Sequence, residues 1–108
     1  MNPLLESHRA AIADACQKFQ VDRLAAFGSV VREDFESRSS DVDLVVRFQA
    51  ADQPGYADRY MDFAETLECF LGRPVDLLTE RALRNPILRR EIEREAVVLY
   101  EDPRSEAT

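Results

Sequence analysis

Hydrophobic and polar residues recur along this chain with two different periods, which together predict alternating helices and strands. Apolar residues at spacings of three, four and seven indicate amphipathic helices over residues 2–19 and 56–71. Short apolar runs rich in β-branched residues predict strands over residues 21–27, 41–48, 73–78 and 96–100. Asn85 followed by Pro86 is typical of a helix start, and this helix is expected to end at Arg94. The alternation predicts an α/β (α+β) domain, a small mixed sheet with helices packed on it.

The apolar stripes identify the residues expected in the core. The first helix contributes Leu5, Ile12, Cys16 and Phe19, and the second contributes Tyr56, Tyr60, Phe63, Leu67, Phe70 and Leu71. The chain of 108 residues has no internal repeat, low-complexity tract or linker. We therefore expect one domain over residues 1–102 and a polar tail over residues 103–108.

The composition is that of a globular protein. Hydrophobic residues make up 45% of the chain and charged residues 32%. No apolar run approaches the roughly 18 residues that a transmembrane helix needs. The first residues, Met1 to Glu6, lack the basic and apolar regions of a signal peptide. A cytoplasmic protein without membrane association is the resulting expectation.

The charge and the scarcity of soft metal ligands argue against two classes of function. The formal net charge of −7 argues against direct nucleic-acid binding, because phosphate contacts need a basic face. The two cysteines and one histidine, Cys16, Cys69 and His8, are too few for a tetrahedral zinc site. Both cysteines lie among apolar neighbours in expected helices, so reduced and buried thiols are predicted. An acidic surface does suit a basic protein partner.

Two aspartates open the second expected strand. Residues i and i+2 of a strand share one face about 6.5–7 Å apart, so Asp41 and Asp43 lie together. Val42, Leu44 and Val46 then face the other way. Aspartate is a poor strand former, and two carboxylates on one face repel each other unless a cation neutralises them. Mg²⁺ held by these carboxylates and by substrate phosphates would resolve the conflict, although an isolated Asp-x-Asp also fits a loop cap and a solvated side chain.

Two further features support a site around that pair. Asp76 lies inside the third expected strand, between Val75 and Leu77, and it completes the site if the two strands are neighbours. Gly28-Ser29 follows the first strand, where glycine lets backbone N–H groups approach a phosphate and the serine hydroxyl can donate to it. Each feature alone has an ordinary explanation, an exposed edge residue for Asp76 and a simple turn for Gly-Ser.

The glycine–serine turn, the aspartate pair and the third aspartate follow one another along the chain in an order that resembles the motifs of the DNA polymerase β-like nucleotidyltransferase superfamily. The resemblance is greatest to its minimal nucleotidyltransferase (MNT) branch. The segments that carry the resemblance are Phe27–Phe35, Ser40–Val46, Leu71–Leu78 and Ile92–Tyr100. The segment between Ser29 and Asp41 is one residue longer than is usual in that branch, and the extra residue falls in the polar loop 36–40. The resemblance implies a polymerase β-like nucleotidyltransferase fold over nearly the whole chain.

The resemblance also implies a reaction. An acceptor hydroxyl would attack the α-phosphate of ATP, so that AMP is transferred and pyrophosphate is released. The residues expected to bind Mg²⁺ and to catalyse this step are Asp41, Asp43 and Asp76. The residues expected to hold the phosphates of the substrate ATP are Gly28, Ser29 and Arg32.

The same resemblance implies a partner. The MNT branch is similar to antitoxins that act on HEPN-domain ribonuclease toxins, so the expected acceptor is a tyrosine of such a toxin. The chain would then form a hetero-oligomer with its partner, or a homo-oligomer. The alternative is an MNT-fold antitoxin that neutralises its partner by binding alone. The three aspartates favour catalysis, because a protein that only binds has no need of them.

Overall fold

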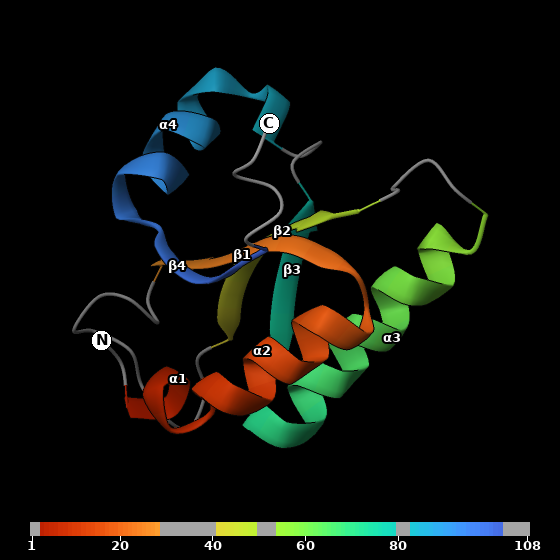
Figure 1. The fold of residues 1–108 in the computed structure, drawn as a ribbon. Helices are drawn as coiled ribbons and strands as arrows, with labels where there is room; N and C mark the ends of the chain where they lie inside the picture. Colours follow the sequence, from red (N-terminus) through yellow and green to blue (C-terminus); the bar gives the residue numbers. More distant parts are fainter. Residues whose placement is uncertain (1–2, 29–40, 50–53, 80–82, 103–108) are drawn as a thin grey trace.

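The computed structural model describes residues 3–28, 41–49, 54–79 and 83–102, which form a four-stranded sheet with helices on both faces (Figure 1). The helices are α1 (Pro3–Ser7), α2 (Arg9–Lys18), α3 (Tyr56–Leu71) and α4 (Pro86–Glu95). The strands are β1 (Val21–Phe27), β2 (Val42–Phe48), β3 (Val75–Thr79) and β4 (Val97–Glu101). The predicted mixture of helices and strands is confirmed, and none of the helices in these ranges is long and apolar enough to cross a membrane.

The largest differences from the predicted element boundaries are in the first helix and the third strand. The first predicted helix is interrupted at His8, whose φ of −111° and ψ of 14° are not helical, and the ring of His8 stacks on Phe70 of α3. The third predicted strand begins at Val75, two residues later than expected. Pro74, just before it, has no N–H to give to the sheet, but its carbonyl accepts a hydrogen bond from Val42 N at 2.9 Å.

The sheet is mixed, with the strand order β3-β2-β1-β4. β1 runs antiparallel to both β2 and β4, whereas β2 and β3 are parallel. Parallel neighbours need a long connection, and α3 lies in the chain between them. β3 and β4 are therefore the two edge strands of the sheet, and β2 is a central strand.

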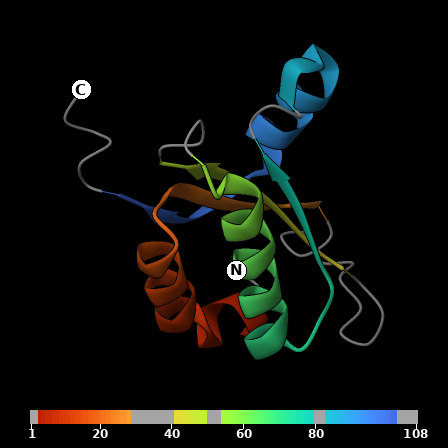
Figure 2. The same ribbon diagram turned by 90° about the vertical axis from the view of Figure 1, so that its right-hand side faces the viewer.

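The two faces of the sheet are covered unequally, as Figure 2 shows, with α1 to α3 on one side and α4 on the other. The larger core lies under α1 to α3 and contains Val42, Leu44 and Val46 of β2. The smaller cluster includes Val45 and packs against Ile92 of α4. The alternation of side chains along β2 that the sequence predicted is therefore confirmed.

The cysteine prediction was right for one residue and wrong for the other. Cys16 is free and fully buried in the larger core, as its place in the apolar stripe of the first helix predicted. Cys69 is also free, but it is exposed. The core-facing stripe of α3 passes through Leu67 and Leu71, and Cys69 lies between these two positions on the outward side of the helix.

Candidate active site

Asp43 and Asp76 lie directly opposite each other on the two parallel strands. The register pairs Asp43 of β2 with Asp76 of β3, and neighbouring strands are about 4.8 Å apart. The face that they share is the one that carries Val45 and α4, opposite to the face of Val42 and Leu44. Asp43 is half-buried and Asp76 is exposed. β3 therefore lies beside the Asp-x-Asp strand, as the prediction for Asp76 required.

The backbone at Gly28 lies against the carboxylate of Asp43. Phe27, the preceding residue, is the register partner of Asp43 across β1 and β2. A Cβ added at Gly28 would stand 2.5 Å from Oδ2 of Asp43, closer than real contacts allow. Gly28 also has a φ of +72°, which a residue with a side chain adopts only under strain. Glycine at this position therefore leaves room for the carboxylate as well as allowing the turn after β1.

Three further residues were predicted for the site. Asp41 is exposed and directly precedes β2, while Ser29 and Arg32 fall outside the described residues. Within the parts of the chain that the structure describes, no three His, Cys, Asp or Glu side chains are grouped closely enough to hold a metal ion. The roles of Asp41, Ser29 and Arg32 stay predictions.

The two opposed carboxylates nevertheless fit Mg²⁺. Magnesium in nucleotide-dependent enzymes is usually held by one or two carboxylates together with water and substrate phosphates, rather than by a complete protein cage. Asp43 and Asp76 supply hard oxygen donors on one face of the sheet. The glycine at position 28 keeps the space beside Oδ2 of Asp43 free of a side chain.

Tyr60 of α3 lies at the border of the site, although the sequence pattern indicated only a core position for it. The Tyr60 hydroxyl donates a hydrogen bond to the carbonyl of Leu77 in β3. Burial, the negative charge of Asp76 and the neighbouring Tyr56 together raise the pKa of Tyr60, in that order of size. No sequence signal distinguishes this tyrosine, because an aromatic residue fits the apolar stripe of α3 equally well.

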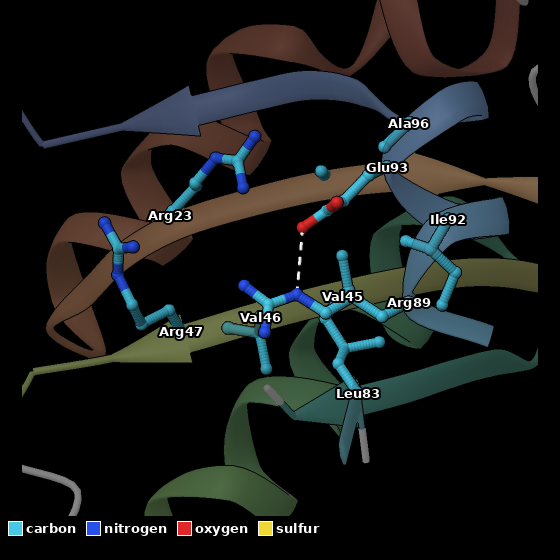
Figure 3. A pocket seen from close by; sticks show the side chains of 10 residues that line it. Arg23, Val45, Val46, Arg47, Leu83, Arg89, Ile92, Glu93 and Ala96 are labelled. Carbon is cyan, nitrogen blue, oxygen red and sulfur yellow. Dashed lines mark hydrogen bonds and ion pairs between the residues drawn. The ribbon is translucent and has the colours of Figure 1, made fainter. Parts of the chain in front are cut away.

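A cavity of about 400 Å³ lies on the same face of the sheet as the two carboxylates, between the sheet and α4 (Figure 3). Its walls combine apolar and cationic groups. The apolar residues include Ala25, Val45 and Ile92, and the cationic ones are Arg23, Arg47 and Arg89. A cavity of this size is within the range typical of small-molecule sites.

Each arginine of this cavity forms an ion pair. The pairs are Arg89 Nε with Glu93 Oε1 at 3.0 Å, Arg23 Nε with Glu101 Oε2 at 3.4 Å, and Arg47 Nε with Asp22 Oδ2 at 3.6 Å. Partly exposed pairs of this kind contribute little to stability, so an anionic group of a ligand can replace the acidic partner at small cost.

Most of this chain matches a known protein family. A family model described as a nucleotidyltransferase domain matches residues 9–99. The chain belongs to this family. It is a minimal nucleotidyltransferase (MNT) domain of the polymerase β-like superfamily, which confirms the resemblance seen in its motifs.

Several relatives share most of their length with this MNT domain. A Methanocaldococcus jannaschii protein provisionally named a protein adenylyltransferase is 32% identical over 94 residues, which cover 87% of this chain and 89% of the relative. A solved structure provisionally described as a minimal nucleotidyltransferase is 33% identical with a TM-score of 0.73, and the match covers 90% of this chain and 95% of that one. The MNT domain is therefore a nucleotidyltransferase with the polymerase β-like fold.

A more distant neighbour shares the fold. It comes from a solved structure of a tri-AMPylated Shewanella oneidensis HEPN toxin in complex with an MNT antitoxin, at 15% identity and a TM-score of 0.64. The match covers 95% of this chain and 77% of the neighbour. At this identity the likeness shows the architecture alone.

Proposed function

We propose that this MNT domain transfers AMP from ATP to a hydroxyl group of a partner protein, in a reaction that requires Mg²⁺. The observation that carries the proposal is the parallel register that sets Asp43 opposite Asp76, with Gly28 against the Asp43 carboxylate. The relatives named as protein adenylyltransferases support the reaction. The solved complex of a tri-AMPylated HEPN toxin with an MNT antitoxin supports a HEPN toxin as the partner and an antitoxin role for this chain.

The described residues have separate tasks in this reaction. Asp43 and Asp76 would hold Mg²⁺, which would supply positive charge against the ATP phosphates, and Asp41 is the third ligand that the sequence predicts. Asp76 is exposed on edge strand β3, where a second protein can reach it, and its carboxylate accepts the proton of the acceptor hydroxyl. The acceptor oxygen forms a bond to the α-phosphorus, and the bond from that phosphorus to the oxygen leading to the β-phosphate breaks. Pyrophosphate leaves, and the acceptor, proposed to be a tyrosine, carries AMP.

The arginine-lined cavity is the proposed place of the nucleoside end of ATP. Val45 and Arg47 follow Asp43 on the same face of β2 at about 6.6 and 13 Å, from the rise of a strand. A nucleotide with its α-phosphate near Asp43 therefore reaches the cavity with its sugar and base. The apolar floor suits the base, and the arginine side chains can donate hydrogen bonds or stack on it.

The test is AMP transfer to a HEPN partner that is co-expressed and co-purified with the chain. Labelled ATP and Mg²⁺ are added, and the label on the partner is measured for the wild type and for Asp43→Asn, Asp76→Asn and the double variant. We expect each single variant to lower the transfer rate by about a hundredfold or more, the usual cost of losing a catalytic carboxylate. Asp62→Asn, an exposed carboxylate on α3, is the matched control and should transfer at the wild-type rate.

The same variants distinguish catalysis from neutralisation by binding alone. If the double variant fails to transfer AMP and also fails to protect cells from the partner, the adenylyltransferase proposal holds. If it protects cells as well as the wild type does, the chain acts by binding. Transfer at the wild-type rate by Asp43→Asn would overturn the proposed site.

A further inference from the structure

An apolar groove lies between α3 and the edge strand β3, the strand that carries Asp76. Its volume is about 460 Å³, and the residues that form it are Tyr56, Ala57, Tyr60 and Met61 of α3 with Leu77, Leu78 and Thr79 of β3. We call it the α3–β3 groove. Figure 2 shows α3 running alongside β3 at this edge of the sheet. The groove therefore adjoins the strand that carries the acceptor-side carboxylate of the proposed reaction.

Met61 gives the groove an exposed apolar wall. Met61 is 56% exposed, whereas the core residues Phe63 and Leu67 of the same helix are fully buried. An exposed methionine adds little to the core of this domain. A flexible thioether side chain is well suited to pack against a partner, because it adapts to irregular apolar surfaces.

The outer edge of β3 already has hydrogen-bond partners from α3. The carbonyl of Pro74 accepts a hydrogen bond from Val42 N of β2. Along β3, the N–H and C=O groups of every second residue point towards β2, and those of the residues between them point outwards. Of the outward groups, Val75 N donates to Glu68 Oε2 at 2.9 Å, and the Leu77 carbonyl accepts from Tyr60. An added strand would have to displace both side chains. The groove is therefore suited to receive side chains of a partner rather than a new strand.

The surroundings of the groove are acidic. Asp58 and Glu65, one turn before and one turn after Met61, are exposed on α3, and Asp76 is exposed on β3. The single basic residue of α3, Arg59, donates to the Gln49 carbonyl at 2.6 Å, and its guanidinium lies over the rings of Phe48 and Tyr56. Negative charge around an apolar groove repels phosphate groups and attracts a basic polypeptide.

From these observations we propose that the α3–β3 groove is the docking site for the acceptor polypeptide. Its occupant is a segment that inserts apolar side chains beside Met61 and places basic side chains near Asp58, Glu65 and Asp76. The identity of the occupant as the acceptor rests on the proposed function, because one wall of the groove is formed by β3, the strand that carries Asp76. Docking there brings a hydroxyl on the same segment to the edge of β3.

Direct binding of labelled peptides tests the proposal. Three synthetic helical peptides each carry one tyrosine: one with leucines next to it and arginines at its flanks, one with serines in place of the leucines, and one with glutamates in place of the arginines. Fluorescence anisotropy measures their affinity for the full chain. We expect the leucine–arginine peptide to bind at least about tenfold more tightly than either of the others. A difference of this size corresponds to the loss of one buried aliphatic side chain or of one set of complementary charges.

Matched variants of the chain locate the binding surface. Met61→Glu should weaken binding of the leucine–arginine peptide by about tenfold or more and leave ATP affinity unchanged. Ile87→Glu is the control, because Ile87 is 71% exposed on α4 and does not line the groove. Equal affinity of the three peptides, absence of peptide binding, or equal loss in both variants overturns the docking site.

The outcome for docking can be separated from the outcome for catalysis. Transfer of AMP from labelled ATP to the same peptides is measured in parallel. Preferential binding of the leucine–arginine peptide without any AMP transfer supports the groove and counts against the proposed function. AMP transfer that does not depend on the peptide sequence or on Met61 supports the proposed function and counts against the groove.

Discussion

The position of one carboxylate depends on the absence of a side chain at Gly28. The sequence suggested this glycine as a phosphate-binding turn, and the structure adds its contact with Asp43. The contact joins residues from two strands, so no local sequence signal contains it. Gly72 offers a comparison, since its φ of +69° resembles that of Gly28 but a Cβ there would meet nothing within 4 Å.

We therefore expect Gly28→Ala and Gly72→Ala to have different effects on ATP binding but a similar cost in backbone strain. Each should lower the free energy of unfolding by about 1–2 kcal/mol, because alanine is strained at positive φ. Gly28→Ala should in addition weaken Mg²⁺-dependent ATP binding by at least about tenfold, since it displaces Asp43. Urea denaturation and ATP titration measure the two effects. Equal ATP affinity in both variants would show that the contact with Asp43 has no role.

A second prediction at this scale concerns Arg47 in the cavity. Arg47→Ala should weaken ATP binding about fivefold, the effect of losing roughly 1 kcal/mol of contact with the nucleoside. Arg90→Ala, an exposed arginine of α4 that does not line the cavity, is the control. Equilibrium binding of a fluorescent ATP analogue measures both. Unchanged affinity for Arg47→Ala would place the nucleoside elsewhere.

At the scale of elements, periodicity predicted the type of each helix and strand but not their neighbours. Val42, Leu44 and Val46 alternate with Asp43 and Val45, and this local period was enough to assign the faces of β2. The pairing of β2 with β3 involves residues more than thirty positions apart, such as Asp43 and Asp76, and no local pattern specifies such a register. The sequence therefore predicted a shared site for these two aspartates only on the condition that their strands are neighbours.

The protection of the β3 edge by α3 leads to a prediction for Glu68. Glu68→Ala removes the acceptor of the Val75 N–H, so exchange of that amide with solvent should become about fivefold faster, for a hydrogen bond of roughly 1 kcal/mol. Glu65→Ala, one turn earlier on α3, is the control and should leave the rate unchanged. Hydrogen exchange followed by NMR gives the rates. An unchanged rate in Glu68→Ala would mean that this carboxylate does not protect the edge.

At the scale of the whole molecule, the larger core contains an ionisable group that stays neutral. Cys16 is fully buried, and burial raises its pKa from 9.0 to about 12. The sequence predicted this burial from the helical stripe, yet it predicted the same for Cys69 because both cysteines have apolar neighbours. The packing of all residues of a helix together decides which side of the helix faces the sheet. The apolar neighbours of Cys69 alone were therefore not enough to predict that it is exposed.

The pKa of Cys16 gives the stability of the domain a defined dependence on alkaline pH. The thiol ionises at lower pH in the unfolded chain than in the folded one, so its full contribution to stability is present below pH 9 and is lost as the pH rises towards 12. We expect the free energy of unfolding to fall by about 1.4 kcal/mol for each pH unit above 9. Cys16→Val should remove most of this slope. Urea unfolding at several pH values measures it, and the same slope in both proteins would contradict a buried neutral thiol.

Titration of ATP by isothermal calorimetry, with Mg²⁺ and then with excess EDTA, tests the central claim that Asp43 and Asp76 form one site for a metal-bound nucleotide. We expect the wild type to bind ATP with Mg²⁺ and to lose at least about tenfold in affinity in EDTA. Asp43→Asn and Asp76→Asn should each show a comparable loss in the presence of Mg²⁺, while Asp62→Asn binds as the wild type does. Equal ATP affinity in all four proteins, with or without the metal, would contradict the claim.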